Sequence, residues 1–212
     1  MPNLYGSLWR LTKFINNKVW IVIEAKFMAQ NFKHLTFTES VKKAQKRYGS
    51  RDIYQRAGEG PDQYQLFQRE ISMIEARDSF YMATVGENGW PYVQFRGGPK
   101  GFLKVIDQET IGYADFKGNM QYISTGNINA TKKAALILLD YPTKRRLKIW
   151  AESEILDPAK HPELRDNLIV EGYDAVIERL VVFYIKAFDW NCPQHINPRY
   201  TMEELEQLNQ LS

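Results

Sequence analysis

The stretch from Pro91 to Tyr122 constrains the fold more than any other part of this sequence. It contains three short runs rich in β-forming residues, Pro91 to Arg96, Phe102 to Asp107 and Thr110 to Phe116. The glycine-rich segment Gly97-Gly98-Pro99-Lys100-Gly101 separates the first two runs, and a short polar break separates the second from the third. Short β-rich runs divided by turn residues are typical of antiparallel strands in one meander. We therefore predict three consecutive antiparallel strands here.

More strands and helices are predicted on both sides of this meander. Asn88-Gly89 favours a tight hairpin turn, because both residues tolerate positive φ. The other predicted strands are Phe80 to Val85, Lys133 to Asp140, Arg145 to Ile155 and Arg179 to Phe188. Lys133 to Asp140 is apolar on both faces, which is typical of a central strand. The predicted helices are Glu39 to Arg47, Asp62 or Gln63 to about Glu75, His161 to Glu171, and a closing helix with the capping box Thr201/Glu204.

The order of these elements indicates the fold class. The segment Met120 to Ile128 fits either a short helix or a loop, and the remaining runs give six or seven strands. Strands and helices do not alternate as in a βαβ protein, which argues against a doubly wound sheet. We expect a mainly β protein with flanking helices, built on a small closed or partly open antiparallel barrel.

Composition and charge exclude several classes of function. The 212 residues carry 28 basic and 25 acidic side chains, a balance that argues against general nucleic-acid binding. No apolar run reaches the ~18 residues that span a bilayer. Cys192 is the single cysteine, so one chain cannot form an internal disulfide or a cysteine-based metal site. A reducing cytoplasm is therefore the expected location.

The first 27 residues differ from the rest of the sequence. Leu4 to Phe27 is aromatic and basic around a short apolar patch, Val19 to Ile23. Charged residues follow this patch at once and no small-residue cleavage site is evident, which argues against a signal peptide. Met28 begins a more ordinary sequence. We expect residues 1–27 to be an extension outside the core, and residues 28–212 to form the barrel domain with its peripheral helices.

Motifs of nucleophilic and metal catalysis are weak. Cys192 and His195 form the only close Cys/His pair in the sequence, and a loop cysteine beside a packed histidine is the favoured interpretation. His34, His161 and His195 are scattered and have no carboxylate at ligand spacing, so no metal site is predicted. No phosphate-binding loop of the Walker or dinucleotide type is present. The sequence leaves the catalytic residues unknown.

Polar side chains at strand ends give the better candidates. They lie beside glycines, where a backbone can approach a ligand closely, and cations near exposed glycine amides suit a phosphate. These residues are Gln94, Arg96, Lys100, Asp115, Lys117 and Asn119. Near the C-terminus, Trp190 could flank a planar ligand and Arg199 could meet an anion. The simpler alternatives are a strand-connecting turn at Gly97 to Gly101, and an aromatic plug with a surface arginine.

The same residues carry a resemblance to a known family. The run GWPYVQFRGGPKGF from Gly89 to Phe102, followed by GYADFKGN from Gly112 to Asn119, resembles the pyridoxamine 5'-phosphate oxidase-related FMN-binding proteins. The run WNCPQHI from Trp190 to Ile196, with Pro198-Arg199, is similar to the C-terminal motif of one branch of that family. The resemblance covers about Met28 to Leu205.

The resemblance implies a split antiparallel β-barrel that forms a homodimer and holds FMN in clefts between the subunits. The matching positions imply a set of cofactor-binding residues: Gln94, Phe95, Arg96, Lys100, Ala114, Asp115, Lys117, Asn119, Trp190 and Arg199. Phe95, Tyr113, Phe116 or Trp190 would cover the flavin ring. Gln94 stands where pyridoxamine phosphate oxidases carry an arginine, so the substrate is left open.

The expected function is an FMN-dependent oxidoreductase that acts on a small molecule. Hydride transfer belongs to the cofactor, so the lack of a catalytic triad or metal site is consistent with it. A non-enzymatic flavin-binding or stress-associated protein is the alternative, because no substrate-recognition motif accompanies the cofactor residues. A haem-binding split barrel is a further option, with His34, His161 or His195 as the axial ligand.

Overall fold

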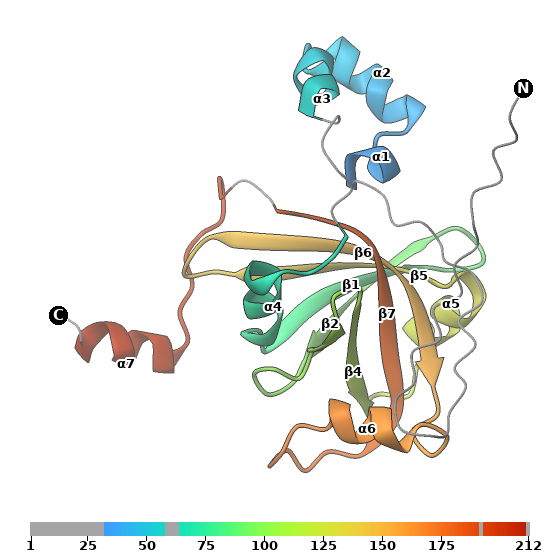
Figure 1. Cartoon of the computed structure of the whole chain (residues 1–212), viewed down its shortest axis with the longest axis vertical. Helices are drawn as coiled ribbons and strands as arrows, with labels where there is room; N and C mark the ends of the chain where they lie inside the picture. Colours follow the sequence, from blue (N-terminus) through green and yellow to red (C-terminus); the bar gives the residue numbers. More distant parts are fainter. Residues whose placement is uncertain (1–31, 58–63, 191–192, 211–212) are drawn as a thin grey trace, which may run out of the picture.

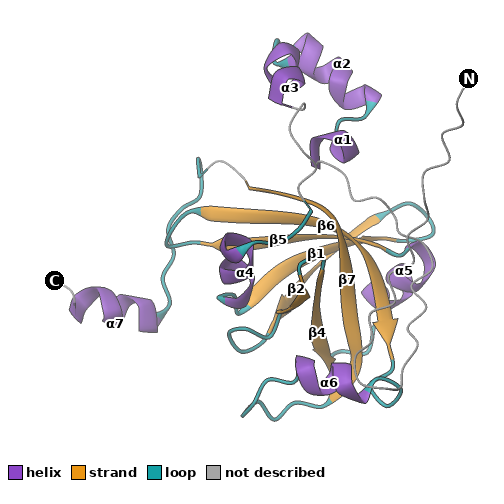
Figure 2. Cartoon of the chain, in the orientation of Figure 1, coloured by secondary structure: helices purple, strands orange, loops and turns teal. Residues whose placement is uncertain are grey.

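The chain folds around a seven-stranded antiparallel sheet (Figures 1 and 2). The computed structural model describes residues 32–57, 64–190 and 193–210, so the predicted extension 1–27 lies outside the described residues. The strands are β1 (Ser79–Val85), β2 (Pro91–Gly97), β3 (Lys104–Asp107), β4 (Thr110–Phe116), β5 (Lys133–Asp140), β6 (Arg145–Leu156) and β7 (Ile177–Trp190). Their order in the sheet is β2-β1-β5-β6-β7-β4-β3.

The sheet confirms the predicted split antiparallel barrel. Every neighbouring pair is antiparallel, and no pairing joins β2 to β3 among the described residues, so the barrel stays open between these edges. The predicted hairpin at Asn88-Gly89 joins β1 to β2, with Gly89 at φ 81°. The apolar strand β5 is central, as expected, because it lies between β1 and β6.

Helices flank the sheet at several points. They are α1 (Phe32–Thr36), α2 (Glu39–Arg47), α3 (Arg51–Ala57), α4 (Gln68–Glu75), α5 (Ile123–Thr131), α6 (Pro162–Leu168) and α7 (Met202–Gln210). The capping box predicted for the closing helix is present: the Thr201 amide donates to Glu204 Oε2 at 2.8 Å, and the Glu204 amide donates to Thr201 Oγ1 at 3.2 Å. The ambiguous segment after β4 contains the helix α5, while α1 and α3 were not predicted.

The helix expected from Asp62 or Gln63 to Glu75 is shorter than predicted. Residues 58–63 lie outside the described part, and the helix begins only at Gln68. Leu66 is fully buried and its amide donates to the carbonyl of Gln108 at 2.7 Å, so tertiary contacts hold this residue outside the helix. The Phe67 amide donates to the Glu70 side chain at 3.3 Å, which marks the helix start.

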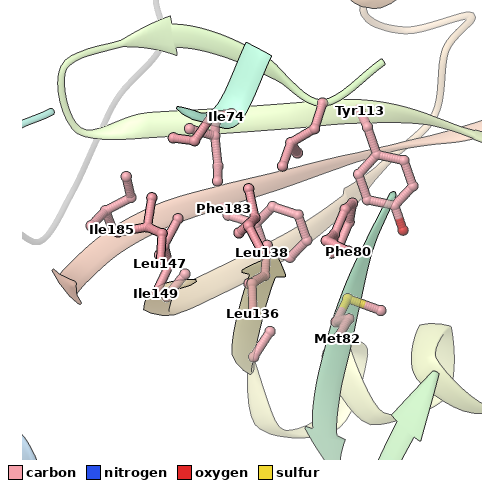
Figure 3. Packing of buried hydrophobic residues seen from close by; sticks show 14 of the residues in the cluster. Ile74, Phe80, Met82, Tyr113, Leu136, Leu138, Leu147, Ile149, Phe183 and Ile185 are labelled. Atoms are coloured by element: carbon pink, nitrogen blue, oxygen red, sulfur yellow. The ribbon is translucent and has the colours of Figure 1, made fainter. Parts of the chain in front are cut away.

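The hydrophobic core lies between the curled strands and α4 (Figure 3). Phe80, Tyr113 and Phe183 form an aromatic group, with ring centroids 5.6 Å apart for Phe80–Tyr113 and 6.0 Å for Tyr113–Phe183. Burial of each such side chain stabilises the fold by roughly 1.5–3 kcal/mol. Burial also raises the pKa of the Tyr113 hydroxyl, and the negative charge of Asp115 adds to that effect. Tyr113 is therefore a core residue and is not available to cover a ligand ring.

The side chains of strand β2 alternate between the two faces of the sheet and so contribute to two different surfaces. Tyr92, Gln94 and Arg96 are half-buried on one face, and Val93 and Phe95 are exposed on the other. Successive residues of a strand point to opposite faces, so Arg96 and Phe95 cannot belong to the same side of the sheet. This alternation decides how the predicted ligand-binding residues are grouped.

Candidate functional site

A cavity of about 150 Å³ lies between β2, the end of β4 and the start of α5. Gln94 and Arg96 line it from β2, Asp115 from β4 and Arg179 from β7. Asp115 and Arg179 are direct partners in the pairing of β4 with β7. Strands β2 and β4 are not neighbours in the sheet, so only the curvature of the open barrel brings Arg96 to Asp115.

The carboxylate of Asp115 holds two guanidinium groups beside this cavity. Its Oδ1 accepts a hydrogen bond from Arg96 Nη1 at 3.1 Å, and its Oδ2 accepts one from Arg179 Nε at 2.8 Å. Arg179 also pairs with Glu178, which accepts a hydrogen bond from the Tyr122 hydroxyl at 3.0 Å. Charged side chains that leave water need such partners. The two arginines are therefore fixed in place before any ligand arrives.

Donor groups remain after these bonds are formed. A guanidinium carries five N–H donors, and the buried Nε of Arg96 finds no acceptor among the described residues. Arg179 lies over the ring of Tyr122, with 4.7 Å between its Cζ atom and the ring centroid. A planar fork of donors is suited to bind carboxylate or phosphate oxygens. The pair of arginines thus offers an anion more hydrogen bonds than Asp115 uses.

The start of α5 forms another wall of the cavity. Tyr122 precedes the helix in the left-handed region at φ 53°, and its side chain makes no capping hydrogen bond. In the described part of the chain no acceptor is found for the amides of residues 123–125. Unpaired amides at a helix start, together with the helix dipole, attract anions. The cavity therefore combines helix amides with two arginines.

Side-chain bonds fix α5 against the sheet. Ser124 Oγ donates to Gln94 Oε1 at 3.1 Å, which joins the helix start to β2. Asn127 Nδ2 donates to Thr84 Oγ1 at 3.0 Å, which joins the next turn to β1. These contacts hold the helix amides and the arginines in one arrangement, which lowers the entropic cost of binding a ligand there.

The structure divides the predicted cofactor-binding residues into three groups. Gln94, Arg96, Asp115 and Asn119 line the 150 Å³ cavity. Phe95, Lys100 and Arg199 line a second cavity of about 670 Å³ beyond the other face of β2. Ala114, Lys117 and Trp190 line neither cavity. The side chains of β2 alternate between the two faces of the sheet. A single ligand within one subunit therefore cannot contact both of the first two groups through β2.

Residues outside the first cavity have contacts of their own. Trp190 Nε1 donates to Glu70 Oε1 at 2.7 Å, and Arg69 lies 4.1 Å from its ring centroid. Arg199 lies 4.9 Å from the ring centroid of Tyr141. The exposed Lys117 is tied through its backbone, since its amide donates to the carbonyl of Val176 at 2.8 Å. Ala114 is buried in a small cluster with Leu168 and Leu180.

Arg179, Tyr122 and Ser124 are site residues that the sequence did not reveal. Arg179 was expected only as the first residue of the last strand, 64 positions away from Asp115. The opposite charges of Asp115 and Arg179 at the ends of two predicted strands are a weak signal for this pair. Without the register of β4 against β7, many other pairings would have fitted equally well.

Metal ligands are not gathered in this site. The described residues contain no group of three or more His, Cys, Asp or Glu side chains that could hold a metal ion. No histidine of the described chain lines either of the two cavities.

Among the described residues, no helix is both long and apolar enough to cross a membrane.

The open antiparallel barrel defines a split-barrel protein, and its 150 Å³ cavity gathers two arginines and helix amides that are suited to an anionic group. The family model of pyridoxamine 5'-phosphate oxidase matches residues 68–187, which is more than half of the chain. The chain therefore belongs to the pyridoxamine 5'-phosphate oxidase family, which confirms the resemblance seen in the sequence. A search of curated proteins finds no match.

Similar folds occur among solved structures. HupZ of Group A Streptococcus is 16% identical, with 63% of this chain and 99% of that chain covered and a TM-score of 0.49. An FMN-binding protein from Syntrophomonas wolfei is 17% identical, with 73% and 96% covered and a TM-score of 0.46. General Stress Protein 26 from Bacillus anthracis is 10% identical, with 61% and 92% covered and a TM-score of 0.43.

Proposed function

We propose that the protein binds FMN, with the phosphate in the 150 Å³ cavity, and acts as an FMN-dependent oxidoreductase on a small molecule. The observation that carries this proposal is the pair Arg96 and Arg179, held by Asp115 next to the free amides at the start of α5. Membership of the pyridoxamine 5'-phosphate oxidase family supports the choice of FMN among phosphate-bearing ligands.

The residues present fit the phosphate of FMN. The two guanidinium groups keep N–H donors that their bonds to Asp115 and Glu178 do not use, and the amides of residues 123–125 supply further donors to a phosphate. The cavity volume of about 150 Å³ suits a phosphate group, whereas the flavin ring must extend beyond it. Gln94 and Asn119 line the same cavity and offer amide groups to a polar edge of the ligand.

The roles of this chain's own side chains follow from that placement. Arg96 and Arg179 bind the phosphate, Asp115 positions both arginines, and Tyr122 with Glu178 restrains Arg179. When FMN is bound, its ring supplies the hydride or electron transfer. The proposal therefore needs no acid, base or metal from the protein, and the single cysteine is compatible with a reducing cytoplasm.

A homodimer is part of the proposal. The outer face of β2 and β1 exposes Tyr81, Val85, Val93 and Phe95, and the rings of Tyr81 and Phe95 meet edge to face with centroids 5.6 Å apart. Exposed apolar surface of this kind is typical of an interface. A second copy on this face would complete the walls that one open barrel leaves to solvent. Phe95→Asp should convert the dimer to a monomer in light scattering, and a monomeric parent would contradict this part.

The visible spectrum of the purified protein tests the cofactor. We expect flavin absorbance, or uptake of micromolar FMN by the apoprotein, and a colourless protein that takes up no FMN would end the proposal. Addition of NADH or NADPH with an electron acceptor then tests the reaction. Bleaching of the flavin with turnover supports an oxidoreductase. Bound flavin that no donor reduces would instead favour the non-enzymatic flavin-binding alternative.

A further inference from the structure

Two helical segments project from the body of the protein, although Glu203, Glu204 and Gln207 of α7 also line the 670 Å³ cavity. The pair α2–α3 projects from one side of the molecule, and α7 projects from another (Figure 1). Helices α2 and α3 pack on each other, with Arg51 Nη1 donating to Gln45 Oε1 at 3.0 Å. Helix α7 has no buried residue. Helices of this length are marginal in water unless an apolar face is covered, so both segments need a partner surface.

The α2–α3 pair presents a basic and partly apolar surface. Residues 39–55 contain five lysines and arginines but only two carboxylates. Glu39 pairs with Lys42 at 2.9 Å, and no carboxylate of the described chain pairs with Lys43 or Lys46. Tyr48 is 78% exposed and Ile53 is 67% exposed on the same helical pair. This surface would suit an acidic partner with an apolar stripe.

Helix α7 has these complementary properties. Residues 201–212 contain three glutamates and no basic residue. Met202, Leu205 and Leu208 recur every three residues, which places them along one side of the helix, and each is exposed. Glu204 is used in the capping box, whereas Glu203 and Glu206 have no cationic partner among the described residues. The helix therefore carries an uncovered apolar stripe flanked by uncompensated acidic side chains.

We propose that α7 of one copy docks on the α2–α3 pair of a second copy. The acidic charge of one segment matches the basic charge of the other, and every copy carries both. In a two-fold dimer the contact forms twice, because each copy offers its α7 to the other. Once the first contact has formed, the second forms between two chains that are already held together, which strengthens the dimer. This inference concerns segments outside the phosphate cavity and does not depend on a bound flavin.

Zero-length cross-linking of carboxylates to lysines tests the contact in the full-length protein. A denaturing gel separates chains joined to each other from chains joined only to themselves, and peptide mapping identifies each junction. We expect junctions between Glu203 or Glu206 and Lys43 or Lys46 in the band of dimer mass. If these junctions occur only in the monomer band, α7 folds onto its own chain and the proposal fails. If they occur in neither band, it fails as well.

Charge reversal provides an independent test. The double variant Glu203→Lys/Glu206→Lys should weaken self-association about tenfold at low salt, because several exposed ion pairs are replaced by repulsion. Lys43→Glu/Lys46→Glu should do the same, and the chain carrying all four changes should regain the parent's association. No change in any variant, or no recovery in the combined one, would overturn the proposal.

Discussion

Replacement of Arg179 by methionine should weaken FMN binding about tenfold to hundredfold and leave riboflavin binding almost unchanged. Methionine keeps an unbranched apolar stem but removes the guanidinium group. A charge-assisted hydrogen bond contributes roughly 1.5–3 kcal/mol, and about 1.4 kcal/mol corresponds to a tenfold change in affinity. Riboflavin lacks the phosphate, so its affinity should not depend on Arg179. Titration of apoprotein with each flavin, followed by flavin fluorescence, measures both affinities.

The fold should tolerate this substitution. The Arg179 bonds to Asp115 at 2.8 Å and to Glu178 are lost, but Asp115 keeps its bond to Arg96 at 3.1 Å and Glu178 keeps the hydrogen bond from the Tyr122 hydroxyl at 3.0 Å. The expected loss of stability is about 1–2 kcal/mol, because each carboxylate keeps one hydrogen-bond partner. Thermal unfolding without flavin measures it.

The matched control is Arg165→Met. Arg165 pairs with Asp166 at 2.7 Å on α6 and lines neither cavity, so this variant should bind both flavins as the parent does. Arg96→Ala should show the same selective loss of FMN as Arg179→Met, and Lys117→Ala tests another of the cations that the sequence predicted to contact the phosphate. The reasoning is refuted if Arg179→Met binds FMN as tightly as the parent. Equal weakening of FMN and riboflavin would also refute it, because the arginine would then act on the ring or on the fold.

Three further predictions concern stability. Gly98→Ala should lower the free energy of unfolding by about 1–3 kcal/mol, measured by denaturant unfolding, because the new Cβ would lie 2.7 Å from the Phe102 ring. Gly126 lies in helix α5, and a Cβ there would meet nothing within 4 Å. Gly126→Ala should therefore raise the free energy of unfolding by roughly 0.5–1 kcal/mol. Burial, and then the charge of Glu154, raise the pKa of Tyr184 to about 12. Its contribution to stability is therefore complete below the ordinary tyrosine pKa of about 10 and is lost as the pH rises through about 12. Tyr184→Phe should remove this part of the alkaline destabilisation, and an unchanged pH profile would contradict the assignment.

Local patterns in the sequence were enough to predict most of the strands and the closing helix. The turn residues Asn88-Gly89 predicted the hairpin between β1 and β2. Two strands were predicted with the bounds that the structure shows, Thr110–Phe116 and Lys133–Asp140. Turn chemistry and β-propensity act over a few residues, so the sequence is enough to predict them. The capping box Thr201/Glu204 was predicted for the same reason. Helix α4 was misjudged at its start, since the buried Leu66 is held by a contact with a distant turn.

Which polar residues form one site depends on contacts between segments that are distant in the sequence. Gln94, Phe95 and Arg96 are adjacent in sequence, yet strand alternation sends Phe95 to the opposite face from its neighbours. Arg179 joins Arg96 on Asp115 only because β7 pairs with β4 in one register and the barrel curls β2 toward them. Strand register and sheet curvature depend on contacts between segments far apart in the chain, so no local pattern encodes them.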